Sequence, residues 1–428
     1  MSTSRYNFES RALGVQNLTC ALEDKLRRTS AIERPRFQTL LDAGALERLA
    51  DATNAANYTF ETVVLYDGKN RRVHIPSPAL SVVDYAASRA IRTFLRVGAE
   101  NRHAITKSLK KTLASGKNYL LLRADVAKFF ESVNHSNLLN LFNGPINRLP
   151  RDCYAFVDAL LDFERKHATN LESCSEHVGL PRGFATSSAL ADLIIANVAR
   201  KMLAHRGIFT FSSFVDDILA IADPLWYPKR TGVAANESDW VRGLLANCLQ
   251  EFGLSLNEDK TFVVSVGELT DSVAVQYLGY KYTVRKDGDK AVVDVDISDE
   301  KYRRIRVQIR GIFQAFVKER DFAMLKQRLR FLTANRQASG RLRVGIGFNF
   351  PLIDVGQRVT NLRELDAGLC GYLLGNRTRI ARQVARLLSD EERKQLRKFG
   401  FVRGLTSRVC YRYTVTKLNR IKAWRRVW

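Results

Sequence analysis

The sequence predicts an α+β fold that combines short antiparallel strands with helices, and three observations support this class. Residues 118–130 contain an apolar strand that ends on Asp125. Residues 208–222 read as a hairpin of two apolar strands around an acidic turn. Elsewhere apolar residues recur every three or four positions, which is typical of helices that bury one face.

The other elements follow in chain order. The first 65 residues read as helical and mixed in charge, with breaks at Pro35 and Gly44. Helices are predicted at 79–95, 137–165, 187–206 and 240–252, and over most of the segment after residue 298. Strands are predicted on both sides of the Asp67-Gly68 turn, at 260–266 and at 274–284, and Asp287-Gly288 marks a further turn.

Length, charge and cysteine content limit the class of protein. The chain has 428 residues, enough for two or three domains, and a net charge of +24. Such a basic chain most often binds a polyanion, with nucleic acid as the first candidate and an anionic membrane surface as the alternative. No run of eighteen apolar residues predicts a membrane span, and the first thirty residues lack a signal-peptide core. The six cysteines are scattered, which predicts reduced residues of a cytoplasmic protein.

Three acidic residues stand where neighbouring strands would bring them together. Asp125 ends the first apolar strand, and Asp216-Asp217 occupies the tip of the hairpin. Adjacent acids on a turn repel each other, so this arrangement is costly unless cations bind there. Magnesium prefers hard carboxylate ligands, and two-metal phosphoryl transfer needs carboxylates that converge on one point. The competing interpretation is that each acid is ordinary solvated surface.

Five further segments decide between these interpretations, because they resemble, in order, the palm motifs of reverse transcriptases. They are ADVAKFFESVNH (124–135), GLPRGFATSSALADLIIANV (179–198), FSSFVDDILAIA (211–222), FGLSLNEDKT (252–261) and VQYLGYKY (275–282). Upstream, RRVHIPSPALSVVDYAASRAI (71–91) resembles the fingers segment of bacterial reverse transcriptases. Among bacterial lineages the chain most resembles retron and defence-associated (antiphage) reverse transcriptases.

The resemblance implies a right-hand polymerase with fingers, a palm and a helical thumb. Its palm would hold an antiparallel sheet with helices, in agreement with the α+β class. The predicted domains are an N-terminal helical region at 1–65, the fingers and palm at 66–290, and a basic helical thumb with a C-terminal extension at 291–428.

The resemblance also implies catalytic and metal-binding roles for single residues. Asp125, Asp216 and Asp217 match the carboxylates that hold two Mg²⁺ ions, with Mn²⁺ as an alternative. Val126 would turn its backbone carbonyl towards a metal. Lys260 matches the lysine that protonates the pyrophosphate leaving group, and the alternative is a solvated turn lysine.

Other matched residues would contact nucleotide or primer. Phe130 stands at the position of the steric gate, whose ring occupies the space of a ribose 2′-hydroxyl; the alternative is a core phenylalanine. Gly183 would let the backbone approach the incoming nucleotide closely. The segment Tyr277, Leu278 and Gly279 matches the primer grip.

The chain departs from the family pattern at one nucleotide-binding position, and its fingers residues are harder to assign. Arg182 stands where glutamine is common, and it would pair with a phosphate or stack on the template. Arg72, Arg102 and Lys107 are candidates to hold the triphosphate, with plain surface charge as the alternative.

The C-terminal tail is strongly basic. After Glu392 there is no acidic residue, while twelve lysines and arginines alternate with aromatic residues up to Trp428. Such a mixture suits a surface that follows a nucleic-acid backbone and stacks on bases. The alternative is a thumb whose aromatic residues form its core and whose charges are solvated.

The sequence therefore predicts a prokaryotic cytoplasmic RNA-directed DNA polymerase, a nucleotidyltransferase that uses dNTPs and Mg²⁺. The resemblance implies a dedicated noncoding RNA as template, a DNA primer or product, and a role in antiphage defence. Self-association or a partner protein stays open, and no membrane is expected. The alternatives are template-independent or protein-primed DNA synthesis, a catalytically silent RNA-binding scaffold, which the intact triad disfavours, and an RNA-dependent RNA polymerase, which Phe130 disfavours.

Overall fold

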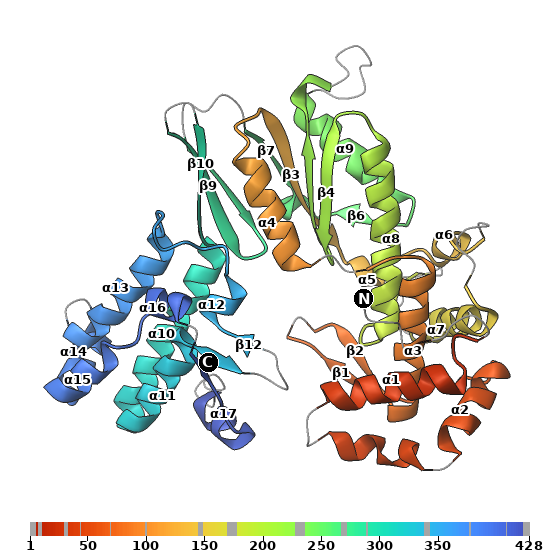
Figure 1. Cartoon of the computed structure of the whole chain (residues 1–428), viewed down its shortest axis with the longest axis horizontal. Coiled ribbons are helices and arrows are strands. Elements are labelled where there is room, and N and C mark those ends of the chain that lie inside the picture. Colours follow the sequence, from red (N-terminus) through yellow and green to blue (C-terminus); the bar gives the residue numbers. More distant parts are fainter. Residues whose placement is uncertain are drawn as a thin grey trace. The chain divides into compact units, whose positions relative to one another are not determined.

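A computed structural model gives the structure of the chain, which divides into two compact units (Figure 1). The first unit comprises Met1–Asn101 and Asn118–Gly267, and the second comprises Arg102–Lys117 and Glu268–Trp428. The structure describes residues 6, 11–29, 33–42, 44–68, 70–98, 101–143, 149–168, 178–226, 236–266, 272–287, 290–337, 343–375, 378–407 and 409–422.

The first unit mixes helices with two sheets. Its helices are α1 (Val15–Arg28), η1 (Arg34–Leu41), α2 (Ala45–Asn54), α3 (Pro78–Phe94), α5 (Phe129–Ser132), α6 (His135–Asn140), α7 (Arg151–Ala168), α8 (Ala185–Ala204), η2 (Pro224–Trp226), α9 (Glu237–Gln250) and η3 (Glu258–Lys260). Its strands are β1 (Thr62–Tyr66), β2 (Arg72–Pro76), β3 (Tyr119–Ala127), β4 (Ile208–Phe214), β5 (Asp217–Ala222), β6 (Ser255–Leu256) and β7 (Phe262–Val266).

The larger sheet of this unit is antiparallel, with the order β4-β5-β3-β6, and β7 also pairs with β3. Strand β3 is central, because β5 pairs along one edge while β7 and β6 pair along the other. Its residues Leu120, Leu121 and Leu122 are all buried, so side chains on both faces of the strand are covered. Helices α8 and α9 contact each other and pack against this sheet (Figure 1).

A buried carboxylate fixes the start of α8. Asp84 of α3 accepts hydrogen bonds from the backbone N–H groups of Ala185 (2.7 Å) and Thr186 (2.8 Å). These are first-turn N–H groups, which have no partner inside the helix. Burial raises the pKa of Asp84, and the hydrogen bonds oppose that rise. The contact therefore sets the position of the turn just before α8, which carries Arg182 and Gly183.

The second unit is mainly helical after its first sheet. Its elements are α4 (Arg102–Leu113), β8 (Val273–Tyr277), β9 (Tyr280–Asp287), β10 (Lys290–Ile297), α10 (Asp299–Glu319), α11 (Phe322–Thr333), β11 (Asn335–Gln337), β12 (Arg343–Val344), α12 (Ile346–Asn349), α13 (Thr360–Leu374), α14 (Arg379–Leu387), α15 (Asp390–Leu396), α16 (Phe401–Thr406), β13 (Cys410–Tyr411) and α17 (Val415–Lys422). Strands β8, β9 and β10 form an antiparallel sheet with buried tyrosines, and α10 packs against α11, α13 and α14.

Within the basic tail, the described aromatic residues are buried or half-buried. Phe401 is fully buried, and the ring of Tyr411 lies 4.9 Å from the guanidinium of Arg330. A buried ring cannot stack on a base, so the interpretation of Phe401 as part of a base-stacking surface is wrong. Trp424 and Trp428 lie outside the described residues.

The structure confirms most predicted elements and corrects two. The single strand predicted at 274–284 is wrong, because β8 ends at Tyr277 and β9 begins at Tyr280, and the positive φ angles of Leu278 and Gly279 turn the chain back between them. The predicted helix at 137–165 is wrong as a single helix, because α6 ends at Asn140 and α7 begins at Arg151. The intervening sequence contains Gly144, Pro145 and Pro150, and proline has no backbone N–H to continue a helix. In the predicted Asp287-Gly288 turn, Gly288 lies outside the described residues.

The predicted division at residues 65 and 290 stays a prediction, because compact units and polymerase subdomains are different divisions of a chain. Among the described helices, none is both long enough and apolar enough to span a bilayer.

Candidate active site

The predicted acidic residues meet at one end of the central strand pair. The Cα atoms of Asp125 on β3 and Asp217 on β5 are direct antiparallel partners. Asp216 lies in the two-residue turn between β4 and β5, and its backbone oxygen accepts a hydrogen bond from the N–H of Val126 at 3.2 Å. Strand register alone therefore brings the three predicted carboxylate residues together.

The turn that carries Asp216 has an unusual backbone. Phe214 pairs with Asp217, so Val215 and Asp216 form a two-residue hairpin turn, and Val215 has φ +63°. Glycine is the usual residue at the positive-φ positions of such turns, and a β-branched side chain there is strained by about 1–3 kcal/mol. This strain is held at the tip of the hairpin, next to the acidic pair.

Arg123 neutralises Asp217. Its Nε lies 3.1 Å from Oδ1 of Asp217, and its Nη2 lies 3.1 Å from Oδ2. Because side chains alternate along a strand, Arg123 projects from the same face of β3 as Asp125, two residues further on. Burial raises the pKa of Asp217, Arg123 opposes the rise, and the nearby charges of Asp125 and Asp216 add to it. Sequence reasoning missed Arg123. Its position two residues before Asp125 on the same predicted strand would have placed both side chains on one face.

Asp125 has its own cationic partner. Its Oδ2 lies 2.9 Å from Nζ of Lys260 and accepts a hydrogen bond from Nδ2 of Asn257 at 3.2 Å. The N–H of Asn257 also donates to the backbone oxygen of Asp125 at 2.7 Å. The segment from β6 to η3 is thus held against the acidic end of β3. Lys260 thus lies beside Asp125, and its predicted role as a proton donor stays a prediction; Asn257 is a contact that the sequence did not single out.

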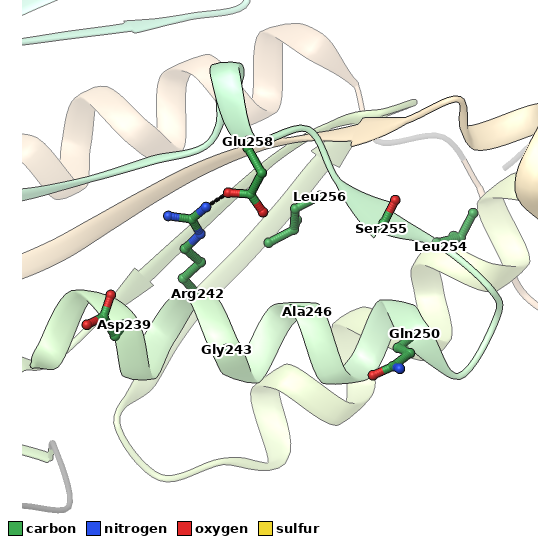
Figure 2. Close-up of a pocket in the computed structure, with 9 residues that line it drawn as sticks. All are labelled: Asp239, Arg242, Gly243, Ala246, Gln250, Leu254, Ser255, Leu256 and Glu258. Atoms are coloured by element: carbon green, nitrogen blue, oxygen red, sulfur yellow. Dashed lines mark ion pairs between the residues drawn. The ribbon is translucent and has the colours of Figure 1, made fainter. Parts of the chain in front are cut away.

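Helix α9 anchors the segment that carries Lys260. Glu258, at the start of η3, forms an ion pair with Arg242 of α9 across a cavity of about 460 Å³, as Figure 2 shows. Leu254 and Leu256 precede Glu258 and are buried beside α9. The ion pair and the two buried leucines therefore fix the position of η3, and with it that of Lys260.

The predicted gate ring is partly exposed and is covered by an arginine. Phe130 is half-buried, whereas its neighbour Phe129 is core. The guanidinium of Arg182 lies 4.7 Å from the centroid of the Phe130 ring. The same guanidinium donates to both carboxylate oxygens of Glu131, at 2.8 and 3.0 Å. Arg182 is thus engaged with the gate ring and Glu131 in this structure.

Gly183 has a clear packing reason to be glycine. Its φ is +103°, and a Cβ built at this position would lie 1.9 Å from the backbone oxygen of His74 on β2. The N–H of His74 donates to the backbone oxygen of Arg182 at 2.8 Å. The backbone at Gly183 therefore lies close to the backbone of β2 in this structure. The predicted approach to a nucleotide stays a prediction.

Two adjacent arginines at the start of β2 have different partners. Arg72 pairs with Glu164 at 2.9 Å and donates to the backbone oxygen of His167 at 2.8 Å, so its guanidinium is engaged with α7. Arg71 pairs with Asp67 at 2.6 Å. The pKa of Arg71 is raised first by Asp67, and the charges of Glu131 and Asp216 contribute. Arg71, which sequence reasoning passed over, is thus paired within its own hairpin.

The other predicted nucleotide and primer residues belong to the second unit. Lys107 is exposed on α4. Tyr277 is buried at the end of β8, and Leu278 and Gly279 form the β8–β9 turn with φ of +48° and +79°. Arg102 donates to the backbone oxygen of Leu278 at 2.5 Å and so contacts the predicted primer-grip turn, and its predicted role in holding the triphosphate stays a prediction.

Comparison with known families places this site in context. A family model described as reverse transcriptase (RNA-dependent DNA polymerase) matches residues 67–282, half of the chain. The chain belongs to the reverse transcriptase family. No individual curated protein matches this reverse transcriptase. Family membership carries the right-hand polymerase fold, which confirms the predicted α+β class, and supports RNA-directed DNA polymerase activity on a nucleic-acid template with dNTP substrates.

Reverse transcriptases generally use divalent metal ions, and the acidic site offers suitable donors. Asp125, Asp216 and Asp217 supply hard carboxylate oxygens from adjacent backbone positions. Within the described ranges, no group of three or more His, Cys, Asp or Glu residues is arranged to hold a metal ion. Arg123 pairs with Asp217, and Lys260 pairs with Asp125. The residues fit a divalent ion by donor type and register.

Proposed function

We propose that this reverse transcriptase joins a primer hydroxyl to an incoming dNTP, with Asp125, Asp216 and Asp217 as ligands of two Mg²⁺ ions. The observation that carries the proposal is the register that sets Asp125 directly opposite Asp217, with Asp216 in the adjoining turn. When bound, such ions stabilise the attacking and leaving oxygens of an in-line displacement.

The remaining side chains of the site have separate tasks in this proposal. Lys260, whose Nζ lies 2.9 Å from Asp125, donates a proton to the pyrophosphate leaving group. Phe130 excludes a ribose 2′-hydroxyl, and Arg182 keeps its ring in place by stacking on it and pairing with Glu131. Arg123 holds Asp217 until metal binds, which limits like-charge repulsion in the metal-free protein.

We further propose a dedicated noncoding RNA as template and a role in bacterial antiphage defence. The support is the resemblance of the chain, among bacterial lineages, to retron and defence-associated reverse transcriptases. Template-independent or protein-primed synthesis is the alternative within the family. Sequencing the nucleic acid that co-purifies with the protein distinguishes them, because templated synthesis leaves DNA complementary to the bound RNA.

The catalytic assignment is tested by Asp216→Ala and Asp217→Ala. Each variant loses a metal ligand, and the loss of several kcal/mol of charge stabilisation predicts a fall in dNTP incorporation of about 10³-fold. Asp158→Ala, at an exposed position of α7, is the matched control and keeps the wild-type rate. Wild-type incorporation by the double variant, with an unchanged melting curve, would exclude this site as the catalytic centre.

A further inference from the structure

A cavity in the second unit is lined by cationic side chains that the polymerase site does not use. Its volume is about 700 Å³, and it lies between α10, α13 and α14. Arg303, Arg306 and Arg310 come from α10, and Arg379 comes from the first turn of α14. The volume is in the range of pockets that enclose small molecules, about 300–1,000 Å³.

The four guanidiniums of this cavity lack acidic partners. All four residues are exposed, and within the described part of the chain none of them forms an ion pair with a carboxylate. The lining contains one described carboxylate, Glu364, which accepts a hydrogen bond from the hydroxyl of Tyr302 at 2.7 Å. The cavity therefore carries an excess of positive charge, which favours an anionic ligand.

The arginines on α10 are spaced along one helix face. Arg303, Arg306 and Arg310 occupy positions i, i+3 and i+7, and Val307 lies between them with 70% of its surface exposed. Seven residues of α-helix span about 10 Å, the axial rise of about three nucleotides of one strand. This row matches successive phosphates better than a single small anion.

The interior of the cavity is apolar and open. Ile309, Leu365 and Ile380 line it together with Tyr372, whose ring stacks on buried Phe313 at 4.6 Å. Gly368 and Gly371 of α13 also line it, and a Cβ added at either would meet no atom within 4 Å. The cavity thus combines a cationic rim with an apolar, aromatic interior, which suits a nucleotide whose phosphate stays at the rim while its base enters.

We propose that this cavity binds an unpaired nucleotide of a nucleic-acid strand, with phosphates on Arg303, Arg306, Arg310 and Arg379 and the base against Tyr372. A base that remains paired cannot enter the cavity. The site therefore distinguishes a strand with an extruded or single-stranded nucleotide from a continuous duplex.

The test compares RNA hairpins with and without one bulged nucleotide, by fluorescence anisotropy without metal or dNTP. Activity of Asp216 and Asp217 therefore plays no part in the result. The wild-type protein is expected to bind the bulged hairpin about tenfold more tightly, since stacking one base contributes about 1–3 kcal/mol. Gly371→Leu fills the cavity and removes this preference without changing the salt dependence. Cys370→Leu, at an exposed position on the same helix, is its control and keeps the preference.

The cationic rim is tested separately by salt dependence. Arg306→Ala and Arg310→Ala each flatten the log–log salt slope by about 0.7, because each removes one phosphate contact. Arg304→Ala is the control, since Arg304 lies on α10, outside the cavity lining, and pairs with Glu300. Free nucleoside monophosphates are expected to compete only weakly with the bulged hairpin, because the proposed ligand is a strand. Full competition by a free nucleotide overturns the proposal. Equal binding of both hairpins by the wild type, or an unchanged preference in Gly371→Leu, overturns the proposal.

Discussion

Gly183→Ala tests whether this glycine serves the packing of the fold. A Cβ at this position would lie 1.9 Å from the backbone oxygen of His74, and contacts below 3.0 Å force a shift, so the two segments must separate by about 1.1 Å. That movement breaks the 2.8 Å hydrogen bond from His74 to Arg182, which costs about 1–3 kcal/mol for the buried donor. The φ of +103° adds about 1–3 kcal/mol of strain for alanine. The expected loss is about 4 kcal/mol in the free energy of unfolding.

Urea denaturation, followed by a spectroscopic signal of the first unit, measures this loss in the free energy of unfolding. Gly243→Ala is the matched control. Gly243 lies in α9 with nothing within 4 Å of its added Cβ, so alanine there stabilises the helix by about 0.5–1 kcal/mol. Two variants of the same chemistry thus shift stability in opposite directions. If Gly183→Ala unfolds like the wild type while its KM for dNTP rises, the packing argument is refuted and the nucleotide-approach prediction is supported.

Three further outcomes follow from single contacts. Burial lowers the pKa of His74 from 6.5 to about 4, so between these pH values the unfolded chain binds a proton that the folded chain does not. The free energy of unfolding therefore falls by up to about 3 kcal/mol as pH falls from 6.5 to 4. His74→Gln flattens this dependence in urea titrations at a series of pH values, whereas His205→Gln, at an exposed position, does not. Phe130→Val lowers discrimination against ribonucleotides in primer extension, and an unchanged ratio of NTP to dNTP incorporation makes the ring purely structural. Arg102→Ala removes the hydrogen bond to Leu278 and the contacts with the rings of Tyr280 and Phe350. It is expected to lower the free energy of unfolding of the second unit by about 2–4 kcal/mol. A chemical denaturation curve within error of the wild-type curve would contradict this expectation.

The sequence by itself determined the order of elements around the acidic residues. An apolar run ending on Asp125 and a hairpin with Asp216-Asp217 at its tip are local patterns, and antiparallel pairing is the simplest way to satisfy both. Period-three and period-four patterns likewise predicted α3, α8 and α9 to within a few residues. The helix predicted at 137–165 failed because apolar spacing was given more weight than the Gly144-Pro145 signal.

Only the tertiary structure decided which charged side chains meet. Arg71 and Arg72 are neighbours in sequence, yet Arg72 pairs with Glu164 of α7, 92 residues away, while Arg71 pairs with Asp67 of its own hairpin. Arg102, a candidate to hold the triphosphate, donates to the backbone of a turn 176 residues away. Burial and backbone position are local properties that the sequence encodes by periodicity. Ion pairs join side chains from segments far apart in the chain, so their partners are set by how those segments pack.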